Sequence, residues 1–374
     1  MDMSNIFLIG DVHLGLGYPN NAEKWFKVHR EYFETFLIPL LKKFVKPGDI
    51  IIQLGDLFDN RNILPINILN YGIDIAEEIS KIAPLHFIIG NHDLWSKNTS
   101  GINSLRPIRY MPNVYIYDKT TKIEHDGVKI LLMPYIESKR EQIKHLEENK
   151  DCKYLFTHSD LNGARMHLTS AANKNLDKIN PIEFSKFEKV YSGHIHIRQE
   201  LKNIVFVGSI FQQDRNDMSD PKGISILNVE SGECEFIPNN VSPIFRKINI
   251  LSEKDIETLD SLTDTKDYID ISISNKLLIK NRKLRRKLEF LLEKGNFSSV
   301  DYVDDLVDET KEKDEEINES STETDLKKIS ITLDYEEYIK DYISKKEYTS
   351  DTFKKGVIDE FNDIIKIYNE NYKL

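Results

Sequence analysis

Short apolar runs alternate with amphipathic helical patterns in the first part of the chain. Apolar side chains recur at helical spacing over 23–44 and 65–82, and 137–149 has the pattern of a polar helix. Between these segments lie continuous apolar runs of the kind that forms strands buried on both faces. The runs are 6–10, 49–54, 85–90, 129–135, 153–158, 189–194 and 203–209. Strands and helices in alternation, followed by further strands, predict an α/β sandwich of layers.

The pattern changes near Pro243. We expect a first domain at 1–243 and a small α+β unit at 244–303. The predicted elements of this unit are strands at 245–250, 268–273 and 297–303 and helices at 253–259 and 276–294. The next segment, 304–325, lacks periodicity and is predicted to be an acidic linker. Two amphipathic helices close the chain within 326–374, each with one apolar stripe.

The net charge of −11 is unevenly distributed along the chain. Residues 301–325 hold 12 Asp or Glu and 2 Lys, so the rest of the chain is close to neutral. The stretch 276–287 holds seven Lys or Arg and no acidic residue. The overall acidity therefore does not exclude a nucleic-acid partner.

Composition also bears on the compartment. The chain has two cysteines, Cys152 and Cys234, without the spacing of a metal or redox motif. This indicates a reducing compartment rather than a disulfide framework. The N-terminus is typical of a strand rather than a signal peptide, and no apolar run is long enough to span a bilayer. We expect a cytoplasmic protein without a membrane partner, in the host cytoplasm if a phage encodes it.

Metal-ligand side chains follow five of the apolar runs, at the point where each run ends. They are Asp11 and His13 in GDVHLG, Asp56 in GDLFD, Asn91 and His92 in GNHD, His158 in FTHSD, and His194 and His196 in SGHIH. Because the carboxyl ends of strands in an α/β sheet form the ligand crevice, these side chains can converge. A single Gly-Asp pair is common turn chemistry, and a single histidine is more often a hydrogen-bonded polar residue. All five in series favour a metal site.

The ligand types indicate which ions would bind. Imidazole and carboxylate suit Mn, Fe, Zn and similar divalent ions, and the lack of cysteine argues against a structural zinc site. Seven such ligands, His92 not counted, are too many for one ion and suit two ions that share a bridge. Paired ions recur in the hydrolysis of phosphate esters, because they activate a water and neutralise charge on the phosphate oxygens. We predict two divalent ions, Mn²⁺ first, with Mg²⁺ or Fe²⁺ as alternatives.

The series GDxH, GDxxD, GNHD, TH and GHxH resembles the calcineurin-like metallophosphoesterase superfamily. Within it, DVHLG and the layout of the chain resemble the nuclease subunits of the SbcCD and T-even phage recombination endonuclease type, in the double-strand-break repair nuclease family. The motifs cover the chain to about residue 210; beyond 245 only the layout is similar, and the insert 304–325 has no counterpart. The resemblance implies a two-sheet sandwich flanked by helices, a small α+β capping domain and a C-terminal helical pair.

The resemblance also implies a role for each residue of the series. The first metal is assigned to Asp11, His13 and His196, the second to Asn91, His158 and His194, and Asp56 bridges both. His92 is then a catalytic general acid that contacts the phosphate, not a ligand. Gly90 is expected to permit a sharp turn. Asp93 either orients His92 as a second residue of the catalytic pair or caps the turn.

Three partners are implied by the same resemblance: DNA, a coiled-coil ATPase of the SbcC or chromosome-maintenance type, and a second copy of the chain in a homodimer. The DNA-binding candidates lie in the basic stretch, which could instead be a solvated helix face or an ATPase contact. They are Lys280, Arg282, Lys283, Arg285 and Arg286. The ATPase-binding candidates lie on the two terminal stripes, which could instead pack on the core of the chain itself. They are Tyr338, Tyr342, Phe353, Val357 and Phe361.

Two functions from different classes follow. The first is a DNA endo/exonuclease subunit of end processing, recombination and repair, acting with a coiled-coil ATPase. The alternative is a stand-alone metallophosphatase or small-molecule phosphodiesterase. The region after residue 244 favours the nuclease, because a small-substrate enzyme has little use for a capping unit and a helical pair. A non-catalytic scaffold is disfavoured, because every ligand type and His92 are present.

Overall fold

The computed structural model describes residues 4–96, 101–172, 174–175, 177–252, 254–255, 265–274, 277, 282–294, 297–303, 355 and 358. The chain forms two compact units, Met1–Asp308 and Glu309–Leu374. The predicted linker and the two predicted terminal helices lie outside the described residues, apart from helical backbone at 355 and 358. The elements below all belong to the first unit.

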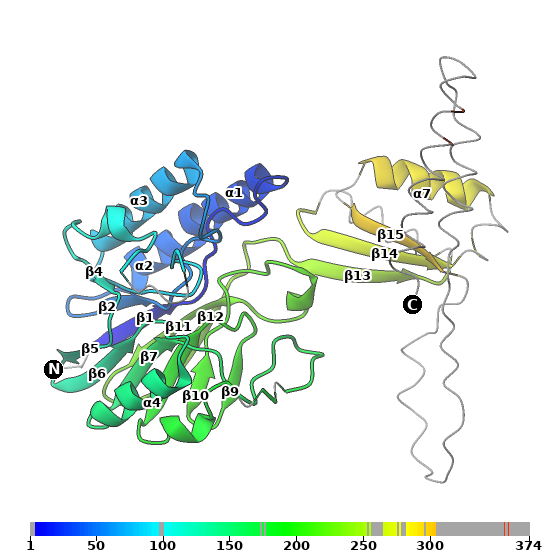
Figure 1. Cartoon of the computed structure of the whole chain (residues 1–374). Helices are drawn as coiled ribbons and strands as arrows, with labels where there is room; N and C mark the ends of the chain where they lie inside the picture. Colours follow the sequence, from blue (N-terminus) through cyan, green and yellow to red (C-terminus); the bar gives the residue numbers. More distant parts are fainter. Residues whose placement is uncertain are drawn as a thin grey trace, which may run out of the picture. The chain divides into compact units, whose positions relative to one another are not determined.

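Two six-stranded mixed sheets form most of this unit (Figure 1). In the first sheet, four neighbouring strands run parallel, and two further strands continue it in antiparallel orientation. Its order is β12 (Cys234–Pro238), β11 (Gly223–Asn228), β1 (Asn5–Ile9), β2 (Ile50–Gln53), β3 (Leu85–Ile88) and β4 (Val114–Tyr117).

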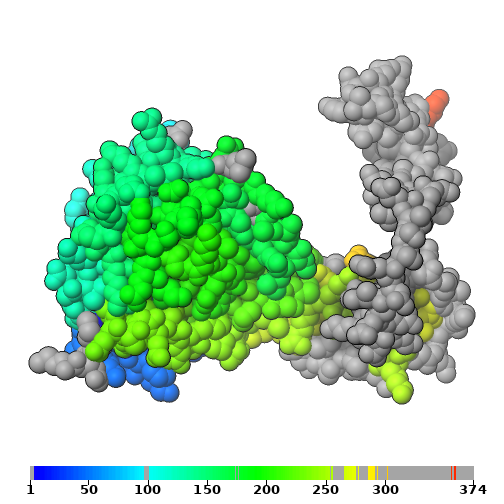
Figure 2. Space-filling view, turned by 90° about the horizontal axis from the view of Figure 1, so that it is seen from below, coloured from blue at the N-terminus to red at the C-terminus, as the bar shows by residue number. Residues whose placement is uncertain are grey.

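The second sheet also has a parallel centre, with one antiparallel strand at each edge. Its order is β5 (Thr121–His125), β6 (Val128–Met133), β7 (Tyr154–His158), β8 (Lys189–Gly193), β10 (Ile204–Phe206) and β9 (Gln199–Leu201). The green and blue-green surface in the space-filling view of Figure 2 comes from the segment of the chain that contains this sheet together with the helix and loops that cover it.

Alternate side chains of a strand enter two different apolar layers. In β1, Ile6 and Leu8 lie in the layer between the sheets, together with Phe156 of the second sheet. Phe7 and Ile9 of the same strand instead belong to the layer beneath the helices of the first sheet. Side chains alternate along a strand, so a continuous apolar run is buried on both faces. This confirms the predicted α/β sandwich and its two sheets.

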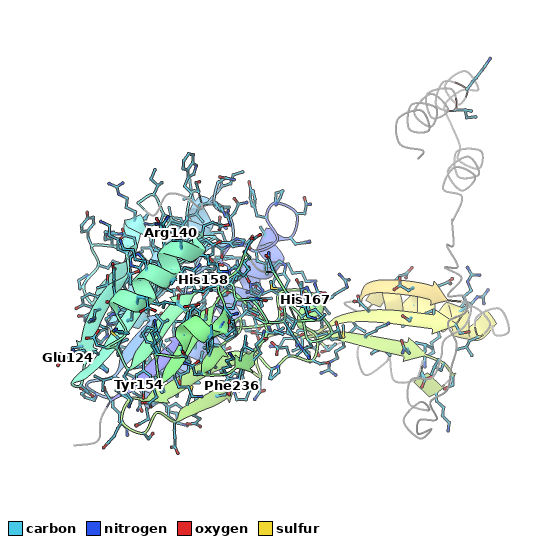
Figure 3. The ribbon with its side chains drawn as sticks, turned by 60° about the horizontal axis from the view of Figure 1, so that its bottom comes forward. Glu124, Arg140, Tyr154, His158, His167 and Phe236 are labelled. Atoms are coloured by element: carbon cyan, nitrogen blue, oxygen red, sulfur yellow. The ribbon has the colours of Figure 1, made fainter. Side chains whose placement is uncertain are left out.

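Helices cover the outer face of each sheet. On the first sheet these are α1 (Ala22–Glu31), a π-helical segment (Tyr32–Leu37), α2 (Ile38–Phe44) and α3 (Ile66–Ser80). On the second sheet, α4 (Lys139–Glu148) packs through Leu146, and Figure 3 labels Arg140 on this helix and Tyr154 on β7. The single helix predicted at 23–44 is helical throughout, with the π-helical segment in its middle.

The apolar pattern did not predict β4, β5, β9, β11 or β12. Most of these are short strands at or near sheet edges, where one face is not covered and polar residues are tolerated. In β5, for example, half-buried and exposed side chains alternate. Strand β11 lies inside its sheet, but Gly223 and Ser225 interrupt its apolar run. Edge strands therefore have a weaker sequence signal than central parallel strands.

A third, three-stranded sheet contains β13 (Phe245–Ile250), β14 (Tyr268–Ser274) and β15 (Phe297–Val303), all parallel. Helix α7 (Arg282–Lys294) lies between β14 and β15 in the chain. The three strands match the predicted α+β unit, and the helix predicted at 253–259 is described only at 254–255. The domain boundary placed after residue 243 falls inside the first unit and stays a prediction. Among the described helices, none has both the length and the apolarity needed to cross a membrane.

Candidate metal centre

The predicted ligands come from the carboxyl ends of strands in both sheets. Asp11 and His13 follow β1, Asp56 follows β2 and Asn91 follows β3, all in the first sheet. His158 ends β7, as labelled in Figure 3, and His194 and His196 follow β8, in the second sheet. The two sheets pack face to face through one apolar layer. Their strand ends therefore meet at one edge, and the seven side chains converge.

A first cluster contains Asp11, His13 and His196, whose ligand atoms lie within 4.8 Å of one another. The Nε2 atoms of His13 and His196 are 3.1 Å apart. The Nε2 atom of His196 is also 3.5 Å from Oδ2 of Asp11.

A second cluster contains Asp56, His158 and His194, again within 4.8 Å, and Asn91 contacts both of its histidines. Oδ1 of Asn91 is 2.9 Å from Nε2 of His158 and 2.7 Å from Nδ1 of His194. Oδ2 of Asp56 is 3.2 Å from Nε2 of His158 and 3.8 Å from Nε2 of His13. The Asp56 carboxylate thus lies between the two clusters, in the position a bridging ligand would take.

The donor set fits divalent ions on the evidence of its hydrogen bonds. Nδ1 of His158 faces the carbonyl of Leu54 at 2.8 Å, and Nδ1 of His13 faces Oδ1 of Asp59 at 3.1 Å. In a neutral ring that donates from Nδ1, the Nε2 atom carries a lone pair. These lone pairs converge with carboxylate and amide oxygens, an arrangement that a shared cation stabilises.

The pKa shifts of the clustered side chains also indicate a site for divalent ions. Burial alone would raise the pKa of Asp56, but His158 and His13 outweigh it and hold that pKa well below its usual range. Burial alone would lower the pKa of His158, but Asp56 and Asp11 outweigh it and raise that pKa to about 9. Burial raises the pKa of Asp11 to about 6 and lowers that of His194 to about 4. Without an ion, a proton on His158 balances the buried carboxylates, so the site favours positive charge.

Three of the candidate ligands have backbone in the left-handed region. The φ angles are 52° for His13, 56° for Asp56 and 80° for His194. Such angles are uncommon for residues other than glycine and concentrate at functional sites.

Gly90 was expected to permit a sharp turn, but the structure indicates a different reason for a glycine at this position. It is not among the glycines with positive φ, and a Cβ there would lie 2.1 Å from Oδ1 of Asp56. The absence of a side chain at this position therefore makes room for the Asp56 carboxylate.

His92 lies beside both clusters. Its backbone N–H donates to Oδ1 of Asp56 at 2.7 Å, and its Nδ1 is 2.6 Å from the carbonyl of Asp59. A ring nitrogen of His92 also lies within 4.8 Å of the ligand atoms of His13 and Asp56. Burial lowers the pKa of His92 below its usual value. Because the Asp59 carbonyl fixes a proton on Nδ1, Nε2 is the atom left for a substrate or an ion.

Asp93 organises the backbone of the site rather than the His92 ring. Its Oδ2 accepts from the N–H groups of Asp56 and Gly90 at 2.8 and 2.9 Å. Its Oδ1 accepts from those of Leu57 and Phe58 at 3.1 and 3.3 Å. Of the two interpretations, the geometry favours turn capping.

Asp59 contacts the site but was not among the predicted residues. Its side chain faces His13 and its carbonyl faces His92. A signal for it existed, since Asp59 is the second aspartate of GDLFD. Tyr135 is a second such residue; its ring stacks on that of His194 at 5.9 Å between centroids. No comparable motif marked it.

The residues predicted to contact DNA and the ATPase are only partly described. Arg285 and Arg286 are exposed on α7, and Arg285 pairs with Glu289 at 3.1 Å. Arg282 and Lys283 are described by their helical backbone alone, and Lys280 lies outside the described residues. The five candidates on the terminal stripes, Tyr338, Tyr342, Phe353, Val357 and Phe361, also lie outside them.

Comparison with known proteins agrees with this geometry. The chain is similar to exonuclease subunit 1 of Enterobacteria phage T4, with 29% identity over 63% of this chain and 68% of that protein. It is also similar to phosphoesterase 244L of Invertebrate iridescent virus 6, with 26% identity over 67% of this chain and 86% of that protein. Phosphoesterase 078R of Invertebrate iridescent virus 3 shows 28% identity over 60% of this chain and 64% of that protein.

A sequence model described as "Calcineurin-like phosphoesterase" matches residues 4–198, which is more than half of the chain and spans every predicted ligand. With this match and the His/Asp clusters at the strand ends, the chain is a metal-dependent phosphoesterase and belongs to the calcineurin-like phosphoesterase family.

Proposed function

We propose that this protein is a DNA nuclease subunit that hydrolyses phosphodiester bonds with two Mn²⁺ ions during DNA end processing, recombination and repair. The observation that carries the proposal is the pair of ligand clusters with Asp56 between them and His92 beside both. The similarity to a phage protein named an exonuclease subunit supports a nucleic acid as the substrate.

In this proposal, Asp11, His13 and His196 hold one ion and Asn91, His158 and His194 hold the other, with Asp56 bridging. When bound, the two ions supply an activated water and neutralise charge on the phosphate. Nδ1 hydrogen bonds keep the Nε2 atoms of His13 and His158 directed at the centre. His92 is the general acid: in its doubly protonated form, Nδ1 stays bonded to the Asp59 carbonyl while Nε2 gives its proton to the leaving oxygen and the ring becomes neutral.

Divalent-ion dependence tests the proposal directly. The purified chain should cut single-stranded or nicked DNA with Mn²⁺, stop when EDTA removes the ions, and recover when Mn²⁺ is added back. A phosphomonoester and a small phosphodiester, assayed in parallel, serve as controls for substrate class. DNA cleavage that continues in EDTA would contradict the two-ion centre. Hydrolysis of the small esters with intact DNA would favour the stand-alone phosphoesterase, a description that the names of the iridescent virus relatives also suit.

Two substitutions separate the general acid from the ligands. His92→Ser should retain both ions and lose about 10²-fold or more in cleavage rate, because it removes a general acid. His196→Ala should lower the metal content, measured by elemental analysis after desalting. His167→Ser is the matched control, since the N–H of His167 donates to the Ser170 hydroxyl and its carbonyl accepts from that hydroxyl, both within one turn away from the clusters. Equal loss of metal in the His92 and His196 variants would make His92 a ligand.

Metal affinity at the second cluster should depend on pH. His158, with a pKa of about 9, is protonated at pH 7 in the metal-free chain, and an ion binds only the neutral ring. Raising the pH removes this competing proton. The Mn²⁺ affinity of this cluster should therefore rise about tenfold per pH unit above neutrality and level off near the pKa. Calorimetric titration at several pH values measures how the Mn²⁺ affinity changes with pH. His158→Asn places an amide without this proton at the site and should abolish the pH dependence. An unchanged affinity in the wild-type chain would contradict the charge assignment.

The proposal includes a coiled-coil ATPase partner and a homodimeric state. The name of the phage relative describes a subunit, and the aromatic stripes within 326–374 supply anchors of the kind that dominate interfaces. A chain ending after Val303 should keep Mn²⁺-dependent cleavage and lose the ATPase in a pull-down from co-expressing cells. The full-length chain is the control. Retained binding with lost cleavage would place the partner site elsewhere and make the terminal helices part of the catalytic fold.

A further inference from the structure

A buried lysine outside the predicted ligand set is bonded to the main chain of a metal ligand. Lys222 directly precedes β11, and its side chain is 3% exposed. Its Nζ atom donates to the carbonyl of His196 at 2.6 Å, and to Oδ1 of Asp217 at 2.8 Å. Oδ2 of Asp220 lies at 2.7 Å. The ammonium has three donors, so these three acceptors satisfy it completely.

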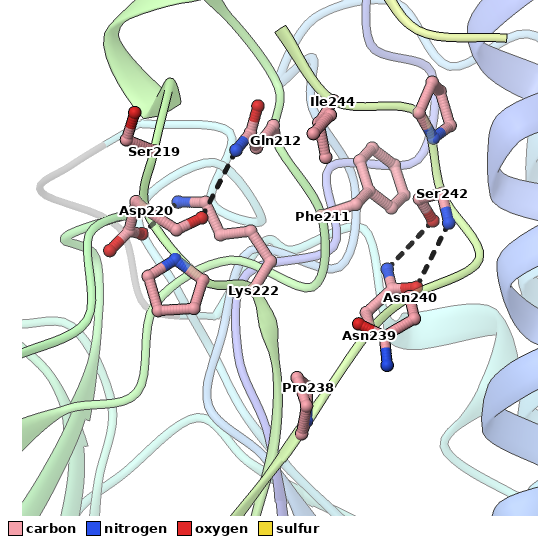
Figure 4. Close-up of a pocket in the computed structure, with 12 residues that line it drawn as sticks. Phe211, Gln212, Ser219, Asp220, Lys222, Pro238, Asn239, Asn240, Ser242 and Ile244 are labelled. Carbon is pink, nitrogen blue, oxygen red and sulfur yellow. Dashed lines mark hydrogen bonds and ion pairs between the residues drawn. The ribbon is translucent and has the colours of Figure 1, made fainter. Parts of the chain in front are cut away.

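Figure 4 shows this lysine beside Asp220 and Gln212, where they line a cavity of about 260 Å³. Because all its donors are used, Lys222 is not available to an anion in the cavity. A buried ion pair is also weak evidence for stability in itself. Its contact with the main chain of His196 therefore points to a role in fixing geometry.

His196 needs such support more than the other histidines do. His13 and His158 each have an Nδ1 contact that fixes the ring. Among the described residues, the hydrogen bonds and ion pairs of the His196 ring involve Nε2 alone. Its side chain is also 31% exposed, so packing holds it less firmly than the fully buried ligands. Its position depends on its main chain, where the carbonyl accepts from Lys222 and from the N–H of Ser209 at 2.9 Å.

The same segment also contacts Asp11, another ligand of the first cluster. The N–H of Ile210 and Nε2 of Gln213 are 3.2 and 3.4 Å from the carbonyl of Asp11. Asp217 joins the two contacts, because its Oδ2 accepts from the N–H of Gln213 at 2.8 Å while its Oδ1 accepts from Lys222. In the part of the chain that the structure describes, no hydrogen bond joins 209–222 to Asn91, His158 or His194. The support is therefore specific to one cluster.

We propose that Lys222 is a positioning residue for His196 and sets the ion affinity of the cluster formed by Asp11, His13 and His196. This rests on the two-ion centre of the proposed function and adds a residue that affects only one of its two ions. Loss of the Lys222 contact lowers the ion affinity of this cluster and leaves the ion affinity of Asn91, His158 and His194 unchanged.

The test uses the full chain, stripped of metal and titrated with Mn²⁺ by calorimetry. Lys222→Met keeps the length of the side chain and removes its charge. Lys222→Met combined with Asp220→Asn restores the net charge of the group, which protects folding if the single variant is unstable. Lys153→Met is the matched control, because Nζ of Lys153 also donates to a main-chain carbonyl, that of Val229 at 3.4 Å.

Wild type and control should bind two ions, and the Lys222 variants should bind one of them about 10–100-fold more weakly. With two equivalents of Mn²⁺ added per chain, electron paramagnetic resonance should show coupled Mn²⁺ pairs in wild type and isolated Mn²⁺ in the variants. Two unchanged affinities would overturn the proposal, as would an equal loss at both sites, which indicates a merely structural role. A wild-type chain that binds fewer than two ions would instead overturn the proposed function, and this inference with it.

Discussion

The buried carboxylate of Asp56 is the constraint on which the rest of the site depends. An anion in the interior is costly unless positive charge and hydrogen bonds compensate it. Oδ1 of Asp56 accepts from the N–H of His92, and its Oδ2 faces His158 and His13. The main-chain N–H of Asp56 itself donates to Asp93. Asp56 thus fixes one candidate acid, two candidate ligands and the turn after β2 at a single point.

This arrangement works only because the two sheets are held at a fixed separation. The ligands after β1, β2 and β3 and those after β7 and β8 belong to different sheets, and no turn connects them directly. The apolar layer that contains Leu8, Ile52 and Phe156 sets the distance between them. Interiors of this kind are closely packed, so a repacked layer would move one half of each cluster relative to the other half.

The sequence was sufficient for the centre of the fold and for the set of side chains that converge at its edge. Strands with continuous apolar runs, such as 49–54, are buried on both faces, and the residues that follow them necessarily lie at the ligand edge. The short edge strands were not predicted, because their side chains are partly exposed and can be polar, as in β5. Lys222 had no sequence signal, since its partner His196 is brought near by tertiary structure alone. The choice between two tasks for Asp93 required the geometry, because either one places an acid next to His92.

Each cluster draws on both sheets, and this has a consequence for the lifetime of the protein. Asp11 and His13 come from the first sheet and His196 from the second; Asn91 and Asp56 come from the first and His158 and His194 from the second. An ion held by either cluster would therefore link the two sheets at this edge of the sandwich. Since a ligand that binds only the folded state stabilises it by mass action, a supply of divalent ions would then raise the free energy of unfolding and the resistance to proteolysis.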